Sequence, residues 1–244
     1  EGVAMYCGST YDACHQDHSG VTICIEHEGE RLELTAESLA VMTGRTPNTK
    51  GLSLDDVGVA LDSRGAIIVG DNMKTSNPVI YAAGDVTDRD QFVYMAAYGA
   101  KIATRNAVLG GNNCYDNSAM PWVVFSDPQV AGVGLGEAQA RDAGLDVKTS
   151  IVPLDQVPRA LAARDTRGLI KLVADRKSDR LLGGQIIAPE GSDTIQTLVM
   201  ALKFGMTTKA LGETIFPYLT TVEGLKLAAQ TFDMDVAKLS CCAG

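Results

Sequence analysis

The sequence lacks the features that mark membrane proteins and nucleic-acid-binding proteins. No apolar run is long enough to span a bilayer, and no secretory signal peptide is recognisable. The 30 acidic residues outnumber the 21 basic ones, and the net charge of −9 argues against a phosphate-binding surface, which needs clustered Lys and Arg. We therefore expect a cytoplasmic protein that contacts neither nucleic acid nor a membrane.

Cysteines are few for a disulfide scaffold, and their spacing matches no standard metal finger. Cys24 and Cys114 are expected to be small buried or inert thiols. Cys7 and Cys14 flank a stretch that we expect to be irregular, where a metal site with nearby histidines stays an open alternative. The full set is Cys7, Cys14, Cys24, Cys114, Cys241 and Cys242.

The first half of the chain is expected to combine short strands with one long helix. Apolar residues recur at helical spacing from Phe92 to Leu109, and Gly110 gives a stop signal. Residues 39–43 are typical of a buried strand in a layered sheet. Other strands are expected at residues 21–27, 66–69 and 79–83, with a turn at residues 28–30.

After a linker at residues 114–120, the organisation of the chain changes. A run of strands with helices gathered afterwards predicts an α+β domain. The strands are expected at residues 122–125, 130–133, 147–152, 169–173 and 181–187, and the helices at 137–143, 194–204, 208–214 and 222–232.

Two segments of the first half are typical of a ligand site in an α/β sheet. Residues 43–48 (TGRTPN) follow an apolar run, and residues 75–86 (TSNPVIYAAGDV) end a strand at Gly84 and Asp85. Gly84 would let a ligand approach the backbone, and Asp85 could accept a hydrogen bond from a ligand hydroxyl. Taken alone, Asp85 is equally well explained as a cap or turn residue.

Together, in this order, the two segments resemble the second flavin-binding segment of the pyridine-nucleotide disulfide oxidoreductase family. The resemblance implies that Asp85 binds the ribitol chain of FAD. It also implies that a helix starting near Gln91, Phe92 and Val93 points its positive end at the flavin ring.

The same resemblance implies a division of the chain into α/β and α+β parts. Residues 1–43 would be the end of an NADPH-binding domain, residues 44–117 the second segment of an FAD-binding domain, and residues 118–244 the dimerisation domain of a homodimer. The chain begins at Glu1 rather than Met, so we expect a piece of a longer protein.

The third motif departs from the family pattern of the disulfide reductases, which carry His-Pro-Thr-x-x-Glu here. Residues 216–223 read FPYLTTVE, so the histidine position falls on Phe216 or, if the glutamate is matched to Glu223, on Tyr218. Neither is a histidine, and all three histidines precede residue 28. The motif therefore lacks the histidine that would protonate an organic thiolate leaving group.

The end of the chain favours a different substrate. Cys241 and Cys242 offer two thiols, and thiolates are soft ligands that select soft metal ions such as Hg(II). A chance pair or a lipidation site are the alternatives, but no basic or apolar anchor accompanies the pair. Further segments resemble the Hg(II)-reducing branch of the family: residues 157–162 (VPRALA), 165–168 (DTRG), 216–232 and 241–244 (CCAG).

That resemblance implies a mercury-detoxifying enzyme in which NADPH reduces FAD, FAD reduces an active-site disulfide, and the resulting thiols hold Hg(II) for reduction. Cys241 and Cys242 of one subunit would deliver Hg(II) to the inner thiol pair of the other subunit, and Tyr218 would line the metal site of its partner subunit. The sequence has no Gly-x-Gly-x-x-Gly and no Cys-x-x-x-x-Cys, so this chain alone is expected to be inactive. The alternatives are a thiol-disulfide reductase such as dihydrolipoamide dehydrogenase, or a non-enzymatic soft-metal-binding or dimerisation module.

Overall fold

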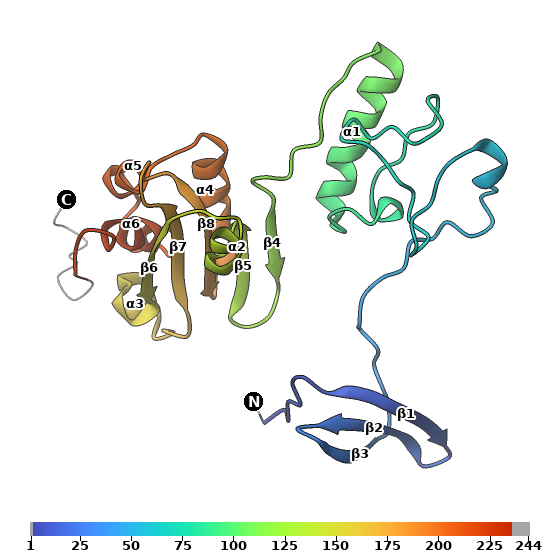
Figure 1. The fold of residues 1–244 in the computed structure, drawn as a ribbon. Coiled ribbons are helices and arrows are strands. Elements are labelled where there is room, and N and C mark those ends of the chain that lie inside the picture. The colour runs from blue at the N-terminus through green and yellow to red at the C-terminus, as the bar shows by residue number, and fades with distance from the viewer. Residues whose placement is uncertain (1, 236–244) are drawn as a thin grey trace. The chain divides into compact units, whose positions relative to one another are not determined.

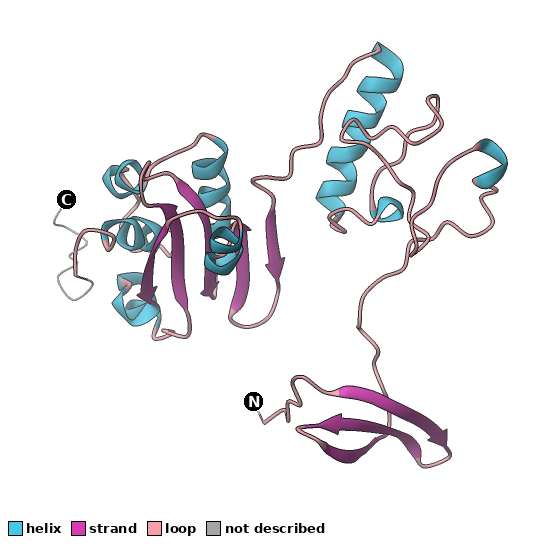
Figure 2. Ribbon diagram, viewed as in Figure 1, coloured by secondary structure: helices cyan, strands magenta, loops and turns pink. Residues whose placement is uncertain are grey.

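A computed structural model describes residues 2–235, which divide into two compact units between Asn113 and Cys114. The elements of both units are labelled in Figure 1 and coloured by type in Figure 2. Cys241 and Cys242 lie outside the described residues.

The first unit opens with a three-stranded antiparallel sheet in the order β1-β2-β3. Its strands are β1 (Thr10–Asp17), β2 (Gly20–His27) and β3 (Glu30–Ala36). The strand expected at residues 21–27 and the following turn are confirmed. The irregular stretch expected around Cys14 is wrong, because Cys14 pairs with Ile23 across β1 and β2. The sequence of β1 has no apolar alternation, so only its pairing with β2 defines it as a strand.

Three strands expected further along the first unit are not formed. Residues 39–43 are an exposed loop, with Met42 88% exposed, and residues 66–69 and 79–83 contribute only the isolated bridges Leu61–Ile67 and Lys74–Tyr81. A buried strand needs hydrogen-bonded neighbours, and among the described residues none forms a ladder with these segments. Short apolar runs cannot show by themselves whether such neighbours exist.

The expected long helix is confirmed as α1 (Val93–Leu109), which ends at Gly110 in the left-handed conformation with φ of 64°. Two short 3₁₀ helices precede it, η1 (Asp55–Val57) and η2 (Asp85–Thr87). Asn106 on the buried side of α1 donates from its amide to the carbonyl oxygens of Asn72 at 3.0 Å and Asn113 at 2.9 Å. These bonds fix loops against the helix.

The second unit is built on a five-stranded antiparallel sheet in the order β4-β5-β8-β7-β6, as expected for an α+β domain. All five expected strands are confirmed. They are β4 (Pro121–Val124), β5 (Gln129–Gly134), β6 (Val147–Pro153), β7 (Leu169–Asp175) and β8 (Leu181–Ala188).

Helices cover both faces of this sheet unequally. The main core lies on the side of Ile170 and Leu172, where α4 and α6 pack, while Val173 points to a smaller cluster with α2. The expected helices are confirmed as α2 (Glu137–Asp142), α4 (Gly191–Lys203), α5 (Thr208–Glu213) and α6 (Glu223–Gln230). The sequence did not reveal α3 (Pro158–Ala163) or the 3₁₀ helix η3 (Leu154–Gln156) before it.

Candidate functional site

The Gly84–Asp85 turn sits tightly against α1. Gly84 has φ of 83°, and a Cβ atom added there would lie 3.1 Å from the Cβ of Ala96. A side chain would therefore both strain the backbone and crowd the helix. The glycine lets the backbone enter η2 with Asp85 as its first residue, so the carboxylate is placed close to the start of α1.

Arg45 joins the two segments that the sequence singled out. Its guanidinium forms an ion pair with Asp85 at 3.1 Å and also donates to the carbonyl oxygen of Gln91. The structure thus brings the TGRTPN segment, Asp85 and the start of α1 together, as the motifs indicate. The linking role of Arg45 was missed, and its only sequence signal is its place inside the TGRTPN segment.

The N-terminus of α1 carries no side-chain cap. Phe92 stands at the N-cap position in an extended conformation, its side chain makes no capping hydrogen bond, and the first turn contains no acidic residue. Val93 is 85% exposed. Phe92 stacks on Tyr94 at 5.2 Å between ring centroids, and burial, with a smaller contribution from the charge of Asp90, raises the pKa of Tyr94. An uncapped helix start beside a half-exposed carboxylate fits a ligand with hydroxyl groups and an electron-rich ring.

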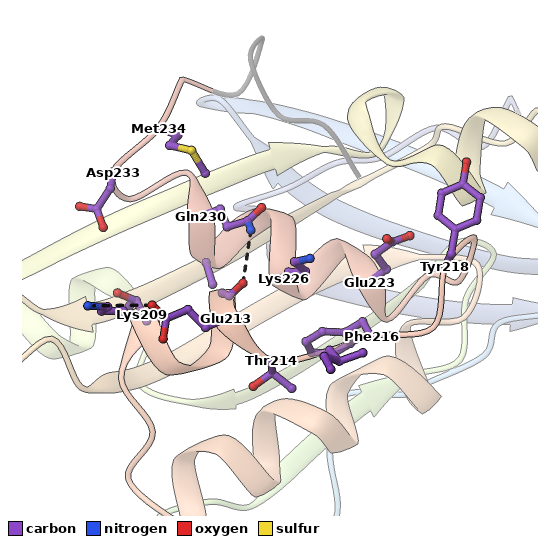
Figure 3. A pocket seen from close by; sticks show the side chains of 14 residues that line it. Lys209, Glu213, Thr214, Phe216, Tyr218, Glu223, Lys226, Gln230, Asp233 and Met234 are labelled. Atoms are coloured by element: carbon purple, nitrogen blue, oxygen red, sulfur yellow. Dashed lines mark hydrogen bonds and ion pairs between the residues drawn. The ribbon is translucent and has the colours of Figure 1, made fainter. Parts of the chain in front are cut away.

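The second candidate site is the loop between α5 and α6, which carries Tyr218. The loop borders a groove of about 940 Å³ lined by residues of α5, the loop and α6. Figure 3 shows Tyr218 at one end of this groove and Asp233 and Met234 at the other. The Tyr218 side chain is exposed (62%), whereas Phe216 packs against the main core. Both residues that could stand at the histidine position line the groove, and Tyr218 is the more exposed of the two.

Glu223 shapes this loop from within. It is buried (3% exposed), and its Oε2 accepts a hydrogen bond at 3.1 Å from the backbone N–H of Leu219, which has φ of 63°. The hydroxyl of Thr220 donates to the carbonyl oxygen of Pro217 at 2.8 Å and accepts from the N–H of Glu223 at 3.3 Å. In the family motif the glutamate would orient a histidine. Here Glu223 instead bonds the backbone beside Tyr218.

The cysteines in residues 2–235 do not gather into a site. Cys24 is buried, as expected, but Cys7, Cys14 and Cys114 are exposed, so the burial expected for Cys114 is wrong. Cys114 opens the second unit ahead of its first strand, where no core covers it. No group of three or more His, Cys, Asp or Glu side chains within the described part could hold a metal ion, which leaves the metal alternative around Cys7 and Cys14 without support.

Two domain models of one family match the two parts of the chain. The dimerisation domain of the pyridine nucleotide-disulphide oxidoreductases matches residues 120–229, and a second pyridine nucleotide-disulphide oxidoreductase domain matches residues 1–102. The chain belongs to the pyridine nucleotide-disulphide oxidoreductase family.

Within that family, the chain is similar to enzymes named mercuric reductase. It is 47% identical to the one from Bacillus cereus over all of this chain and 39% of that enzyme. It is 53% identical to the one from Acidithiobacillus ferrooxidans over 87% of this chain and 39% of that enzyme. The chain thus spans well under half the length of these relatives.

Solved structures of the family share the fold at lower sequence identity. LpdA from Mycobacterium tuberculosis superposes with a TM-score of 0.84 at 25% identity, over 96% of this chain and 50% of that one. The HOCl-induced flavoprotein disulfide reductase RclA from Escherichia coli gives a TM-score of 0.80 at 29% identity, over 91% of this chain and 50% of that one. In the part of the chain that the structure covers, no helix is long and apolar enough to cross a membrane.

Proposed function

We propose that this chain supplies the second FAD-binding segment and the dimerisation domain of an NADPH-dependent flavoenzyme that reduces Hg(II) to Hg(0). The observation that carries the proposal is the contrast in identity. The chain is 42–53% identical to mercuric reductases but only 25–29% identical to LpdA and the flavoprotein disulfide reductase RclA, which share its fold. In this proposal residues 1–43 end the NADPH-binding domain, residues 44–117 belong to the FAD-binding domain, and residues 118–244 form the homodimer interface.

The Asp85 region has the groups that would hold FAD. Gly84 lets the backbone approach, Asp85 would accept from a ribitol hydroxyl, and the uncapped start of α1 at Gln91, Phe92 and Val93 would face the ring. FAD, when bound, would relay the two electrons of NADPH. The positive end of α1 would stabilise negative charge that develops near it.

The second unit would handle the metal ion, which is the substrate. Cys241 and Cys242 would bind Hg(II) as thiolates and pass it to the partner subunit by stepwise exchange, one sulfur replacing another, so that no bare ion is released. Tyr218 would line the receiving site, where its phenol oxygen could contact the ion during exchange. NADPH gives up two electrons as a hydride, Hg(II) accepts both, and NADP⁺, H⁺ and Hg(0) are the products.

A thiol-disulfide reductase is the second candidate, and the fold similarity to the flavoprotein disulfide reductase RclA favours it. Against it stands the third motif, in which Tyr218 is exposed and Glu223 bonds the Leu219 backbone. A disulfide reductase needs a proton donor for the leaving thiolate, and a tyrosine has too high an ordinary pKa to act as an acid–base group near neutral pH as histidine does.

The test compares NADPH oxidation by the full-length protein with Hg(II) and with an organic disulfide as oxidant. Oxidation that depends on Hg(II) supports the proposal, and oxidation with the disulfide alone overturns it. The delivery role is tested by the paired change Cys241→Ala and Cys242→Ala in the presence of competing small thiols. Cys114→Ala, which removes an exposed thiol elsewhere in the same unit, is the matched control.

A further inference from the structure

A hydrogen bond from Thr221 attaches the Tyr218 loop to the body of the second unit. The hydroxyl of Thr221, buried in the loop, donates a hydrogen bond of 2.7 Å to Oε2 of Glu190. Glu190 stands at the N-cap position of α4, directly after β8 and Pro189. Because it lies between a central strand and a main-core helix, Glu190 is a firm attachment point for the loop.

Glu190 also faces a second element. Its Oε1 lies 3.8 Å from a guanidinium nitrogen of Arg159 on α3, so its two carboxylate oxygens serve two different partners. Arg159 belongs to the VPRALA segment, whose role the proposed function leaves unexplained. A pocket of about 250 Å³ brings together Arg159, Glu190, Thr221 and Asp165, which comes from the DTRG segment. Residues of both unexplained segments thus line one pocket together with Thr221 of the Tyr218 loop.

Two carboxylates therefore form hydrogen bonds with the loop. Glu223 bonds the N–H of Leu219, the residue after Tyr218, and Glu190 bonds the side chain of Thr221. Transfer of a metal ion between ligands depends on the positions of the donor atoms, and a displacement of about 1 Å can cost about a hundredfold in rate. The bonds to the backbone and side chains next to Tyr218 therefore bear on where its phenol oxygen lies.

We propose that Glu190, acting through Thr221 and backed by Arg159, is a positioning residue that holds the Tyr218 loop for Hg(II) transfer. This inference rests on the proposed function, since it gives the contact a role in that reaction. A positioning role and a purely structural role of this contact predict different effects of mutation. If Thr221 acts through Tyr218, then its removal matters for Hg(II) reduction only while the phenol hydroxyl is present.

The test uses Thr221→Val in the full-length enzyme, with Tyr218 intact and with Tyr218→Phe. The valine keeps the shape of threonine but removes the donor to Glu190. With Tyr218 intact we expect kcat/KM for Hg(II) to fall roughly three- to tenfold, the size of a lost hydrogen bond to a charged group that is partly exposed. In the Tyr218→Phe background the same change should cost less than about twofold. Equal losses in both backgrounds, or no loss with Tyr218 intact, would overturn the proposal.

Two further variants separate positioning from general stability. Glu190→Gln keeps an oxygen that accepts from Thr221 and should retain most of the activity, whereas Glu190→Leu should resemble Thr221→Val. Ser178→Ala removes another hydroxyl bond to a carboxylate, to Asp175 at 2.6 Å, that involves neither the Tyr218 loop nor its groove. It should lower stability without a selective loss in kcat/KM, and a loss equal to that of Thr221→Val would contradict the inference.

The rate of backbone hydrogen exchange in residues 217–222 of the full-length protein measures how firmly the loop is attached, and it does not require Hg(II) turnover. We expect faster exchange in Thr221→Val than in Ser178→Ala. If the wild-type protein does not reduce Hg(II) while this difference is present, the proposed function fails and the attachment of the loop stands. If exchange is the same in both variants, the positioning inference fails whatever the activity.

Discussion

The carboxylate of Glu223 accepts a hydrogen bond of 3.1 Å from the backbone N–H of Leu219, and Leu219 takes a left-handed φ of 63°. A leucine in that conformation carries a cost of about 1–2 kcal/mol, so the surrounding contacts must offset it. The bond links the start of α6 to the middle of the loop and directs the residue before Leu219, Tyr218, toward solvent.

Replacement of Glu223 by alanine is expected to lower the free energy of unfolding by about 1–3 kcal/mol, because the bond to the Leu219 N–H is lost in a buried setting. Glu223→Gln keeps an acceptor oxygen and should cost less than Glu223→Ala. Urea unfolding of the full-length protein measures both. Equal costs for the two variants would show that the bond to Leu219 does not stabilise the loop.

Replacement of Asp85 by alanine is expected to weaken FAD binding by roughly tenfold or more, since a hydrogen bond to a charged acceptor contributes about 1.5–3 kcal/mol. Flavin fluorescence, titrated against the full-length apoprotein, gives the dissociation constant. Asp71→Ala is the control, because Asp71 is another exposed carboxylate of the first unit, paired with Arg89 at 3.1 Å. Unchanged affinity in Asp85→Ala would remove Asp85 from the proposed site.

Replacement of Gly168 by alanine should destabilise the second unit by about 2 kcal/mol or more. Gly168 has φ of 127°, and an added Cβ would lie 1.9 Å from the carbonyl oxygen of Ile187 in β8, where only backbone movement can relieve the clash. Gly144→Ala is the control, since φ there is 78° but no atom lies within 4 Å of the added Cβ. Thermal unfolding should show the larger loss for Gly168→Ala, and the reverse order would contradict this packing.

Acid should remove a small stabilising contribution of Asp116. Hydrogen bonds from the Ser118 side chain and backbone, with Lys203, lower the pKa of Asp116 to about 2. A carboxylate with a depressed pKa in the folded state stabilises it fully above the unfolded value near 3.8, and the contribution is lost as pH falls toward 2. Because the ion pair with Lys203 is about half exposed, we expect less than about 1 kcal/mol.

The measurement is urea unfolding of the wild-type protein and Asp116→Asn across that pH range. The difference between the two should be constant above about pH 5 and should shrink as the pH falls from about 4 to 2. A difference that stays constant through this range would mean that the charge of Asp116 contributes nothing.

The sequence correctly predicted the helices and strands whose signal lies within a single short segment. The helical spacing from residue 93 to 109 and the alternating strands of the second unit carry their own signals, and all of them form. Residues 39–43, 66–69 and 79–83 have apolar runs of the same kind, but a strand also needs a partner, which no run of residues can specify. β1 is the opposite case, a strand defined by its partner alone.

The candidate-site residues also differ in whether a local motif could reveal them. Asp85 and the start of α1 were found because they lie six to eight residues apart in a motif. The bond from Arg45 to Gln91 spans 46 positions, and the bond from Thr221 to Glu190 spans 31, so neither could be predicted before the chain was folded. The sequence left Phe216 and Tyr218 both open for the histidine position. In the structure both line the same groove, with Phe216 packed partly against the core and Tyr218 62% exposed.

The most direct test of the proposed function is the yield of Hg(0) per NADPH consumed by the full-length protein. Purified enzyme would be given NADPH and Hg(II) held by a small thiol, and volatile mercury would be collected while NADPH oxidation is followed. We expect one Hg(0) for each NADPH, because both reactions transfer two electrons. NADPH oxidation without Hg(0), or oxidation that requires an organic disulfide, would show that the chain serves a different reductase of the same family.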